Sequence, residues 1–178
     1  MGAQRDDPNL GGEVRLTLAA ASDADFAWMI RGEGRSERGF VLPPGGVDGT
    51  AHLEMLRGVA RRLRAHGLAL WMIVADGEVV GLCSYKDAPT ADGSVEIGYG
   101  IAATRRRRGY ATRAAAALVD VARQDAAVRT VLADTVVDNV SSQRVLAKNG
   151  FQRVGTRTDP IDGELIIWRI DVASNAEP

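Results

Sequence analysis

The chain is poor in the residues that build disulfides, metal centres and thiol active sites. It has one cysteine, Cys83, so it can form no intramolecular disulfide, which suits a reducing compartment such as the cytoplasm. A catalytic thiol needs a histidine beside it, but His52 and His66 fall on one predicted helix that the sequence does not place near Cys83. So few cysteines and histidines also argue against a structural zinc site. We therefore expect Cys83 to be a small core residue, and we expect no metal.

A membrane-spanning run and a basic overall charge are also missing. No apolar run approaches the roughly 20 residues that cross a bilayer, and the polar N-terminus lacks the apolar core of a signal peptide. The net charge is −1, whereas a general nucleic-acid binder is usually basic. These absences predict a cytoplasmic protein that binds neither nucleic acid nor a membrane.

What remains is the composition of an ordinary folded domain. With 178 residues and 46% hydrophobic content, the chain has the length and the core-forming side chains of one domain. We place this domain at residues 13–172, between a flexible N-terminal tail at residues 1–12 and a C-terminal tail at residues 173–178. Runs rich in apolar residues, several of them alternating with polar ones, predict strands at 14–18, 68–75, 79–86, 95–102, 128–136, 151–155 and 165–170.

Helices and loops are predicted from caps, apolar spacing and composition. Ser22 or Asp23 caps a short helix whose apolar stripe leaves Trp28 outside. An amphipathic helix follows at residues 51–66. Between the two helices, residues 31–49 are rich in glycine, charge and proline and form a long loop. Such loops are often functional, and a mobile surface loop is the alternative.

The most informative stretch runs from residue 95 to residue 123. Apolar residues alternate with glycines and a carboxylate at 95–102, four arginines follow at 105–108, and an alanine-rich helix begins after Gly109. A helix N-terminus offers unpaired N–H groups and a partial positive charge, and glycine lets the backbone approach a ligand closely. The stretch therefore predicts a phosphate site, although it matches neither a P-loop nor the dinucleotide-binding fingerprint. A solvated basic face is the alternative.

Two motifs in the chain resemble a known family. Arg106-Arg107-Arg108-Gly109-Tyr110-Ala111 is similar to the Arg/Gln-x-x-Gly-x-Gly/Ala signature of the GNAT superfamily of N-acetyltransferases. The segment 139–151 resembles the family's Asn-x-x-Ser…Lys-x-Gly-Phe pattern, most like the branch that acetylates protein N-termini, including ribosomal proteins. The resemblance covers roughly residues 12 to 172. It implies the α/β (α+β) GNAT fold, a central mixed, mostly antiparallel sheet of about seven strands flanked by about four helices.

The resemblance also implies a binding site for acetyl-CoA as cosubstrate. The basic turn would hold the pyrophosphate through Arg106, Arg107, Arg108, Gly109, Tyr110, Ala111 and Thr112. Main-chain groups of Tyr99, Gly100 and Ile101 would face the pantetheine arm, and we assign the oxyanion donor to the N–H group of Ile101. Asn139 would hydrogen-bond the pantetheine arm and Ser142 would lie close to it, with helix capping as the other role open to both.

Glu96 is the predicted catalytic base, because the family often places on this strand a carboxylate that works through water. Alternatively, Glu96 orders the sheet or binds the ammonium group of the acceptor. Gly98 and Gly100 suit a strand that bulges or is closely approached. Leu146 stands where many family members have a tyrosine that serves as general acid, so no acid role is carried over to this helix.

These features predict an N-acetyltransferase that moves the acetyl group of acetyl-CoA to a primary amine by direct attack in a ternary complex. The sequence does not decide whether the acceptor is a protein N-terminus or a small-molecule amine, and it does not decide whether the protein forms a homodimer. The main alternative is a catalytically silent acyl-CoA-binding sensor or interaction module. A basic-patch nucleic-acid binder is more distant, because only Tyr110 could stack near the arginines.

Overall fold

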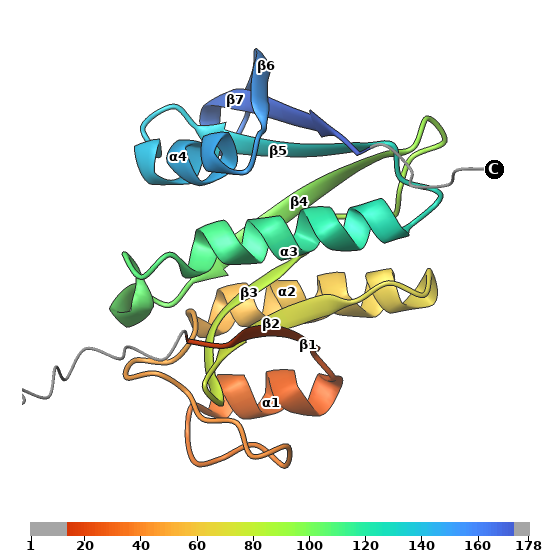
Figure 1. Ribbon diagram of the computed structural model, residues 1–178. Coiled ribbons are helices and arrows are strands. Elements are labelled where there is room, and N and C mark those ends of the chain that lie inside the picture. The colour runs from red at the N-terminus through yellow and green to blue at the C-terminus, as the bar shows by residue number, and fades with distance from the viewer. Residues whose placement is uncertain (1–13, 173–178) are drawn as a thin grey trace, which may run out of the picture.

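A seven-stranded sheet runs through the computed structural model, which describes residues 14–172 (Figure 1). In chain order the elements are β1 (Leu16–Ala20), α1 (Asp23–Arg31), α2 (Thr50–Ala65), β2 (Leu70–Ala75), β3 (Glu78–Tyr85), β4 (Ser94–Ile101), the short 3₁₀-helix η1 (Ala103–Arg105), α3 (Tyr110–Gln124), β5 (Thr130–Val136), α4 (Val140–Lys148), β6 (Gln152–Asp159) and β7 (Gly163–Asp171). The mixed, mostly antiparallel sheet that the sequence predicted is confirmed. The tails predicted at residues 1–12 and 173–178 lie outside the described residues.

The strand order is β1-β2-β3-β4-β5-β7-β6. Strands β1 to β4 form an antiparallel meander, and β4 and β5 are parallel neighbours joined by α3. The tight turn between β2 and β3 consists of Asp76 and Gly77, with φ angles of 48° and 82° that suit a two-residue hairpin loop. The predicted strand at 151–155 is longer in the structure, because β6 pairs with β7 as far as Asp159.

Helix α1 shows one correct prediction and one error. Ser22 is its N-cap, and it forms a capping box in which Asp25 N donates to Ser22 Oγ at 3.1 Å and Ser22 N donates to Asp25 Oδ2 at 2.9 Å. The prediction that Trp28 lies off the buried stripe is wrong, since its exposed fraction is 3%. The following loop explains the difference, because Trp28 Nε1 donates to the Gly34 carbonyl at 3.3 Å and the indole is covered there.

Helices cover both faces of the central strands. Consecutive residues 79–85 of β3 are all buried, which requires packing on both faces of the sheet. Helix α3 packs against β1, β3 and β4, and α2 packs against β2 and α1 (Figure 1). Because side chains alternate along a strand, β4 directs Ile97, Tyr99 and Ile101 to the face that carries α3 and α4, and it directs Glu96 to the opposite face.

Candidate active site

Strands β4 and β5 separate part-way along their length. They pair only at their beginnings, where Ser94, Val95 and Glu96 lie opposite Thr130, Val131 and Leu132. Both strands continue beyond these pairs, β4 to Ile101 and β5 to Val136, so an opening forms between their carboxyl-terminal halves. In α/β sheets such an opening is a common ligand site.

The main chain of β4 faces this opening at alternate residues. Hydrogen bonds from Lys86 N to Glu96 O at 2.7 Å and from Ala102 N to Val80 O at 2.9 Å show that the even-numbered residues of β4 bond to β3. The odd-numbered residues therefore direct their main-chain groups toward the β5 side. Tyr99 and Ile101 present N–H groups to the opening in this way. Gly100, which the sequence grouped with them, instead directs its main-chain groups toward β3.

The basic turn after β4 forms the mouth of the opening. Its left-handed residues Arg107 (φ 65°) and Gly109 (φ 77°) bring the chain round to the start of α3. Gly109 is the N-cap and supplies no side-chain cap, and the first hydrogen bond in the helix runs from Arg113 N to Gly109 O at 3.2 Å. The N–H groups of residues 110–112 are thus left without an intrahelical partner, as at any helix start. They form a site suited to an anion.

The arginines of this turn have different roles. Arg105 forms a two-pronged ion pair with Glu78 at the start of β3, with Nη2 to Oε1 at 2.8 Å, so it anchors the turn. Arg106 Nε donates to the Ile101 carbonyl at 3.2 Å and ties the turn to the end of β4. Arg107 and Arg108 are exposed and can approach an anion from solvent. Tyr110 is only 8% exposed and belongs to the core, and so offers no stacking surface.

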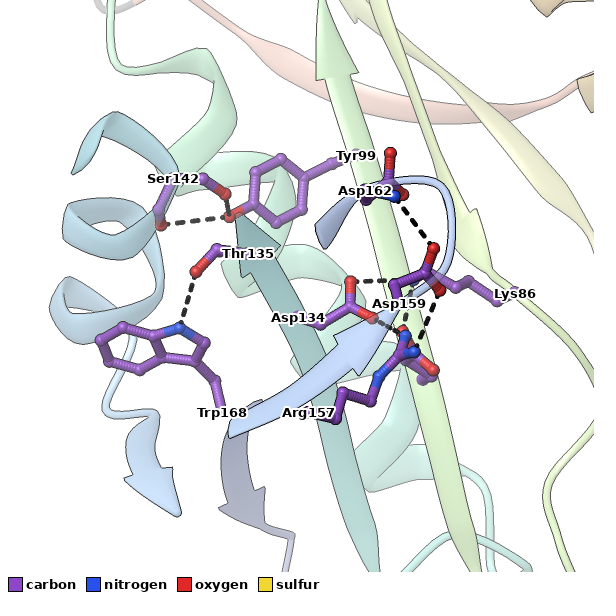
Figure 2. Close-up of polar contacts among 10 residues, drawn as sticks. Lys86, Tyr99, Asp134, Thr135, Ser142, Arg157, Asp159, Asp162 and Trp168 are labelled. Carbon is purple, nitrogen blue, oxygen red and sulfur yellow. Dashed lines mark hydrogen bonds and ion pairs between the residues drawn. The ribbon is translucent and has the colours of Figure 1, made fainter. Parts of the chain in front are cut away.

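Helix α4 closes the opening from the side of α3. Asn139 caps this helix, since its Oδ1 accepts from Ser142 N at 3.1 Å and from Ser141 Oγ at 2.9 Å. Tyr99 reaches across from β4, and its hydroxyl lies 2.8 Å from Ser142 Oγ (Figure 2). Burial raises the pKa of Tyr99, and the contact with Ser142 offsets part of that rise. Leu146 is fully buried in the core.

On the opposite face of the sheet, charged side chains from β4, β5 and β6 meet the lysine that follows β3. Lys86 Nζ forms ion pairs with Glu96 of β4 and, at 3.0 Å, with Asp134 Oδ1 of β5. Arg157 of β6 pairs with Asp134 and, at 3.2 Å, with Asp159 (Figure 2). We call Lys86, Glu96, Asp134 and Arg157 the charged cluster. Glu96 was predicted from its strand, but no sequence signal pointed to the other three members, because they come from separate elements.

The charged cluster sets the protonation of its two carboxyl groups. Burial raises the pKa of Glu96, the Lys86 ammonium partly offsets this, and the nearby charge of Asp134 raises it further. Burial also opposes ionisation of Asp134, but hydrogen bonds with Lys86, Glu96 and Arg157 outweigh it and lower the pKa of Asp134. Glu96 is therefore the carboxyl group of the pair that takes up a proton first. A raised pKa makes it a better base near neutral pH than an ordinary glutamate.

The long loop before α2 lies beside the basic turn. Thr104 Oγ1 donates to the Pro44 carbonyl at 3.1 Å, and Val41 bridges to Glu78 at the start of β3. A hollow of about 540 Å³ lies between this loop and the end of α1, with Met29, Ile30 and residues 41–46 among its lining. The loop therefore borders the turn that follows β4, where it could contribute to an acceptor site.

Metal and thiol chemistry find no support in the described part of the chain. Within residues 14–172 no three or more histidine, cysteine, aspartate or glutamate side chains gather as a metal site would require. Cys83 is 2% exposed and burial raises the pKa of its thiol, which confirms it as a core residue. Among the same residues, no helix is both long and apolar enough to cross a bilayer.

Comparisons with known proteins agree with this geometry. A family model described as "Acetyltransferase (GNAT) domain" matches residues 14–152. The uncharacterized N-acetyltransferase YjdG of Bacillus subtilis is 34% identical over 87 residues, which cover 48% of this chain and 52% of that protein. The match thus spans about half the length of this curated relative.

Solved structures share the fold at low identity. RimJ of Mycobacterium smegmatis in complex with CoA-disulfide has a TM-score of 0.69 at 21% identity, covering 91% of this chain and 84% of that one. RimL, a ribosomal L7/L12 alpha-N-protein acetyltransferase in complex with coenzyme A, has a TM-score of 0.67 at 16% identity, covering 90% and 96%. An aminoglycoside acetyltransferase in complex with coenzyme A has a TM-score of 0.66 at 22% identity, covering 88% and 95%.

Proposed function

Since the chain belongs to the GNAT acetyltransferase family, we propose that it transfers the acetyl group of acetyl-CoA to a primary amine. The observation that carries this proposal is the opening between β4 and β5, which ends at a helix N-terminus with no side-chain cap. A thioester that lies along β4 and a pyrophosphate at the start of α3 would occupy both features at once. The family match alone would not identify which residues of this chain bind the cofactor and catalyse the transfer.

Cofactor binding follows from the main chain. The N–H groups of residues 110–112 would hold the pyrophosphate, with Arg107 and Arg108 adding positive charge. The pantetheine arm would run along the opening and hydrogen-bond the main chain of Tyr99, which leaves the Ile101 N–H group for the thioester oxygen. Asn139, whose side chain caps α4, and Ser142, in the first turn of that helix, would line the other side of this path.

The reaction would be a direct attack in a ternary complex. The neutral amine attacks the thioester carbon, the carbonyl oxygen gains negative charge, and the carbon–sulfur bond then breaks to release the thiolate of coenzyme A. The N–H group of Ile101 would stabilise that oxyanion. The proton lost by the amine would pass through water to Glu96. A thiol with a reference pKa of about 8.5 gives a thiolate that can leave without prior protonation. This suits a chain that has leucine at position 146, where many family members have the tyrosine general acid.

The acceptor would approach the face of the sheet that carries the charged cluster. With Asp159 included, three carboxylates there face the two cations Lys86 and Arg157, and this excess of negative charge would favour a cationic amine, such as a peptide N-terminus or a small-molecule amine. RimL is named for a protein N-terminus and another neighbour for aminoglycosides, so both acceptor classes occur among structures with this fold. We place the reaction in the cytoplasm, where the Cys83 thiol would stay reduced.

A panel of amines with mass detection of the acetylated product tests this proposal. The panel should contain N-terminal peptides, polyamines and aminoglycosides, each incubated with acetyl-CoA and the full chain. We expect one acceptor class to be acetylated at a rate that depends on the enzyme. Tight binding of acetyl-CoA with no product from any amine would instead support the acyl-CoA-binding sensor.

A further inference from the structure

Gly81 of β3 lies against the peptide bond that joins Gly100 to Ile101 in β4. A Cβ atom built at Gly81 would lie 2.2 Å from the Gly100 carbonyl oxygen and 2.9 Å from Cδ1 of Ile101. Both distances are below the 3.0 Å that real Cβ atoms respect, and the nearer atom is backbone that no rotamer change can move. Position 81 therefore requires glycine so that β4 can pack this close, and any side chain at this position would displace β4.

The glycines of β4 itself do not explain this close approach. A Cβ atom at Gly100 would meet nothing within 4 Å, and one at Gly98 would meet only Lys86 side-chain atoms at 3.9 Å or more. The close approach that the sequence placed at Gly98 and Gly100 therefore occurs at Gly81, on the neighbouring strand. A sequence motif centred on β4 could not have identified it.

The orientation of one peptide group connects Gly81 to the site. No cis peptide bond is present in the described residues, so the Ile101 N–H points opposite to the Gly100 carbonyl in the same planar group. The carbonyl is turned toward β3, into the space that a side chain at Gly81 would fill. The Ile101 N–H is consequently turned away from β3 and toward the opening between β4 and β5.

We propose that Gly81 is a positioning residue that aims the Ile101 N–H at the thioester oxygen. The inference rests on the proposed acetyl transfer, in which this N–H group is the oxyanion donor. To reach an ordinary contact of 3.4 Å from the present 2.2 Å, an alanine at this position would have to push the Gly100 carbonyl by more than 1 Å. Misplacing a reacting group by about 1 Å can cost on the order of 10²-fold in rate.

The test compares Gly81→Ala with Gly155→Ala. Gly155 lies in β6, and a Cβ atom there meets nothing within 4 Å, so this control adds the same methyl group without a clash. We expect Gly81→Ala to lower kcat by roughly 10²-fold, because it misaligns an interaction that matters most in the transition state. Its affinity for free coenzyme A, measured by calorimetry, should stay close to that of the wild type, since coenzyme A has no thioester oxygen. Gly155→Ala should change neither value.

A second measurement covers the case in which Gly81→Ala does not fold. In the wild-type protein labelled with ¹⁵N, the Ile101 amide signal should move further with acetyl-CoA than with coenzyme A, because only acetyl-CoA carries the oxygen it binds. Equal shifts with the two ligands would overturn the inference, as would an active wild type whose Gly81→Ala variant folds and keeps its kcat. A wild type that acetylates no amine would overturn the proposed function and this inference together.

Discussion

Removing the charge of Lys86 gives a direct test of Glu96 as the base. The Lys86 ammonium contacts Glu96 and counteracts the burial that raises its pKa. In Lys86→Met this counteracting charge is gone, so the pKa of Glu96 should rise further. A base works only when ionised, so the rise of kcat/KM with pH should move to higher pH.

The size of this shift follows from the exposure of the pair. Two unit charges about 4 Å apart attract by about 4 kcal/mol at an effective dielectric constant of about 20. The side chains of Lys86 and Glu96 are 45% and 34% exposed, so solvent screens most of that energy. About 1 kcal/mol is a reasonable remainder for a pair of this kind. The expected shift is then a little under one pH unit, because 1.36 kcal/mol corresponds to one pKa unit.

The assay is kcat/KM for the best acceptor, recorded as a function of pH from mildly acidic to alkaline conditions. Lys148→Met is the matched control, because Lys148 is the only other lysine in the chain and lies exposed in the last turn of α4. The control should keep the wild-type profile. A Lys86→Met profile whose acid limb stays in place, or moves to lower pH, would refute the assignment of Glu96 as the base.

Three further changes probe other parts of the reasoning. Gly109→Val should abolish acetyl-CoA binding in calorimetry on a folded variant, because a side chain blocks the close approach of phosphate and valine resists the φ of 77° found there; unchanged affinity would contradict the phosphate site. Glu96→Gln should lower kcat by roughly 10²-fold while Lys86 keeps its bond to Asp134, and an unchanged kcat from neutral to mildly alkaline pH would leave Glu96 without a catalytic role. Tyr85→Phe should leave the melting temperature unchanged or raise it by a few degrees, because the buried Tyr85 hydroxyl has no hydrogen-bond partner within residues 14–172 and such a group costs about 1–3 kcal/mol; a clear fall in Tm would show that the hydroxyl is satisfied in solution.

Local signals explain why much of this fold could be predicted from the sequence. The Asp76-Gly77 turn, the Ser22 or Asp23 cap and the glycine before α3 each fix the backbone within a few residues, and each marks a boundary that the structure contains. The parallel pairing of β4 with β5 was also predictable, because a strand–helix–strand unit has few ways to fold.

Features that depend on contacts between distant segments could not be predicted in the same way. Trp28 is buried because a loop returns over α1, and the helical spacing of its neighbours carries no information about that loop. Lys86, Asp134 and Arg157 meet only after the β3–β4 and β6–β7 hairpins, the β4–β5 crossover and the β5–β7 pairing have formed, with bonded partners up to 48 positions apart in the sequence. Nothing in the local sequence of any of them indicates a charged cluster.

The alternation of odd- and even-numbered residues along β4 explains how one strand could serve both substrates. Its odd-numbered residues direct their main-chain groups to the opening and their side chains to α3 and α4, so the cofactor would be bound by atoms common to every residue type. Its even-numbered residues bond to β3 and direct their side chains to the opposite face, where Glu96 meets Lys86 and Asp134. Cofactor binding should therefore tolerate changes of side chain along β4, whereas acceptor binding should depend on which side chains stand there. On this basis we expect the face of the charged cluster, rather than the basic turn, to determine which amine is acetylated.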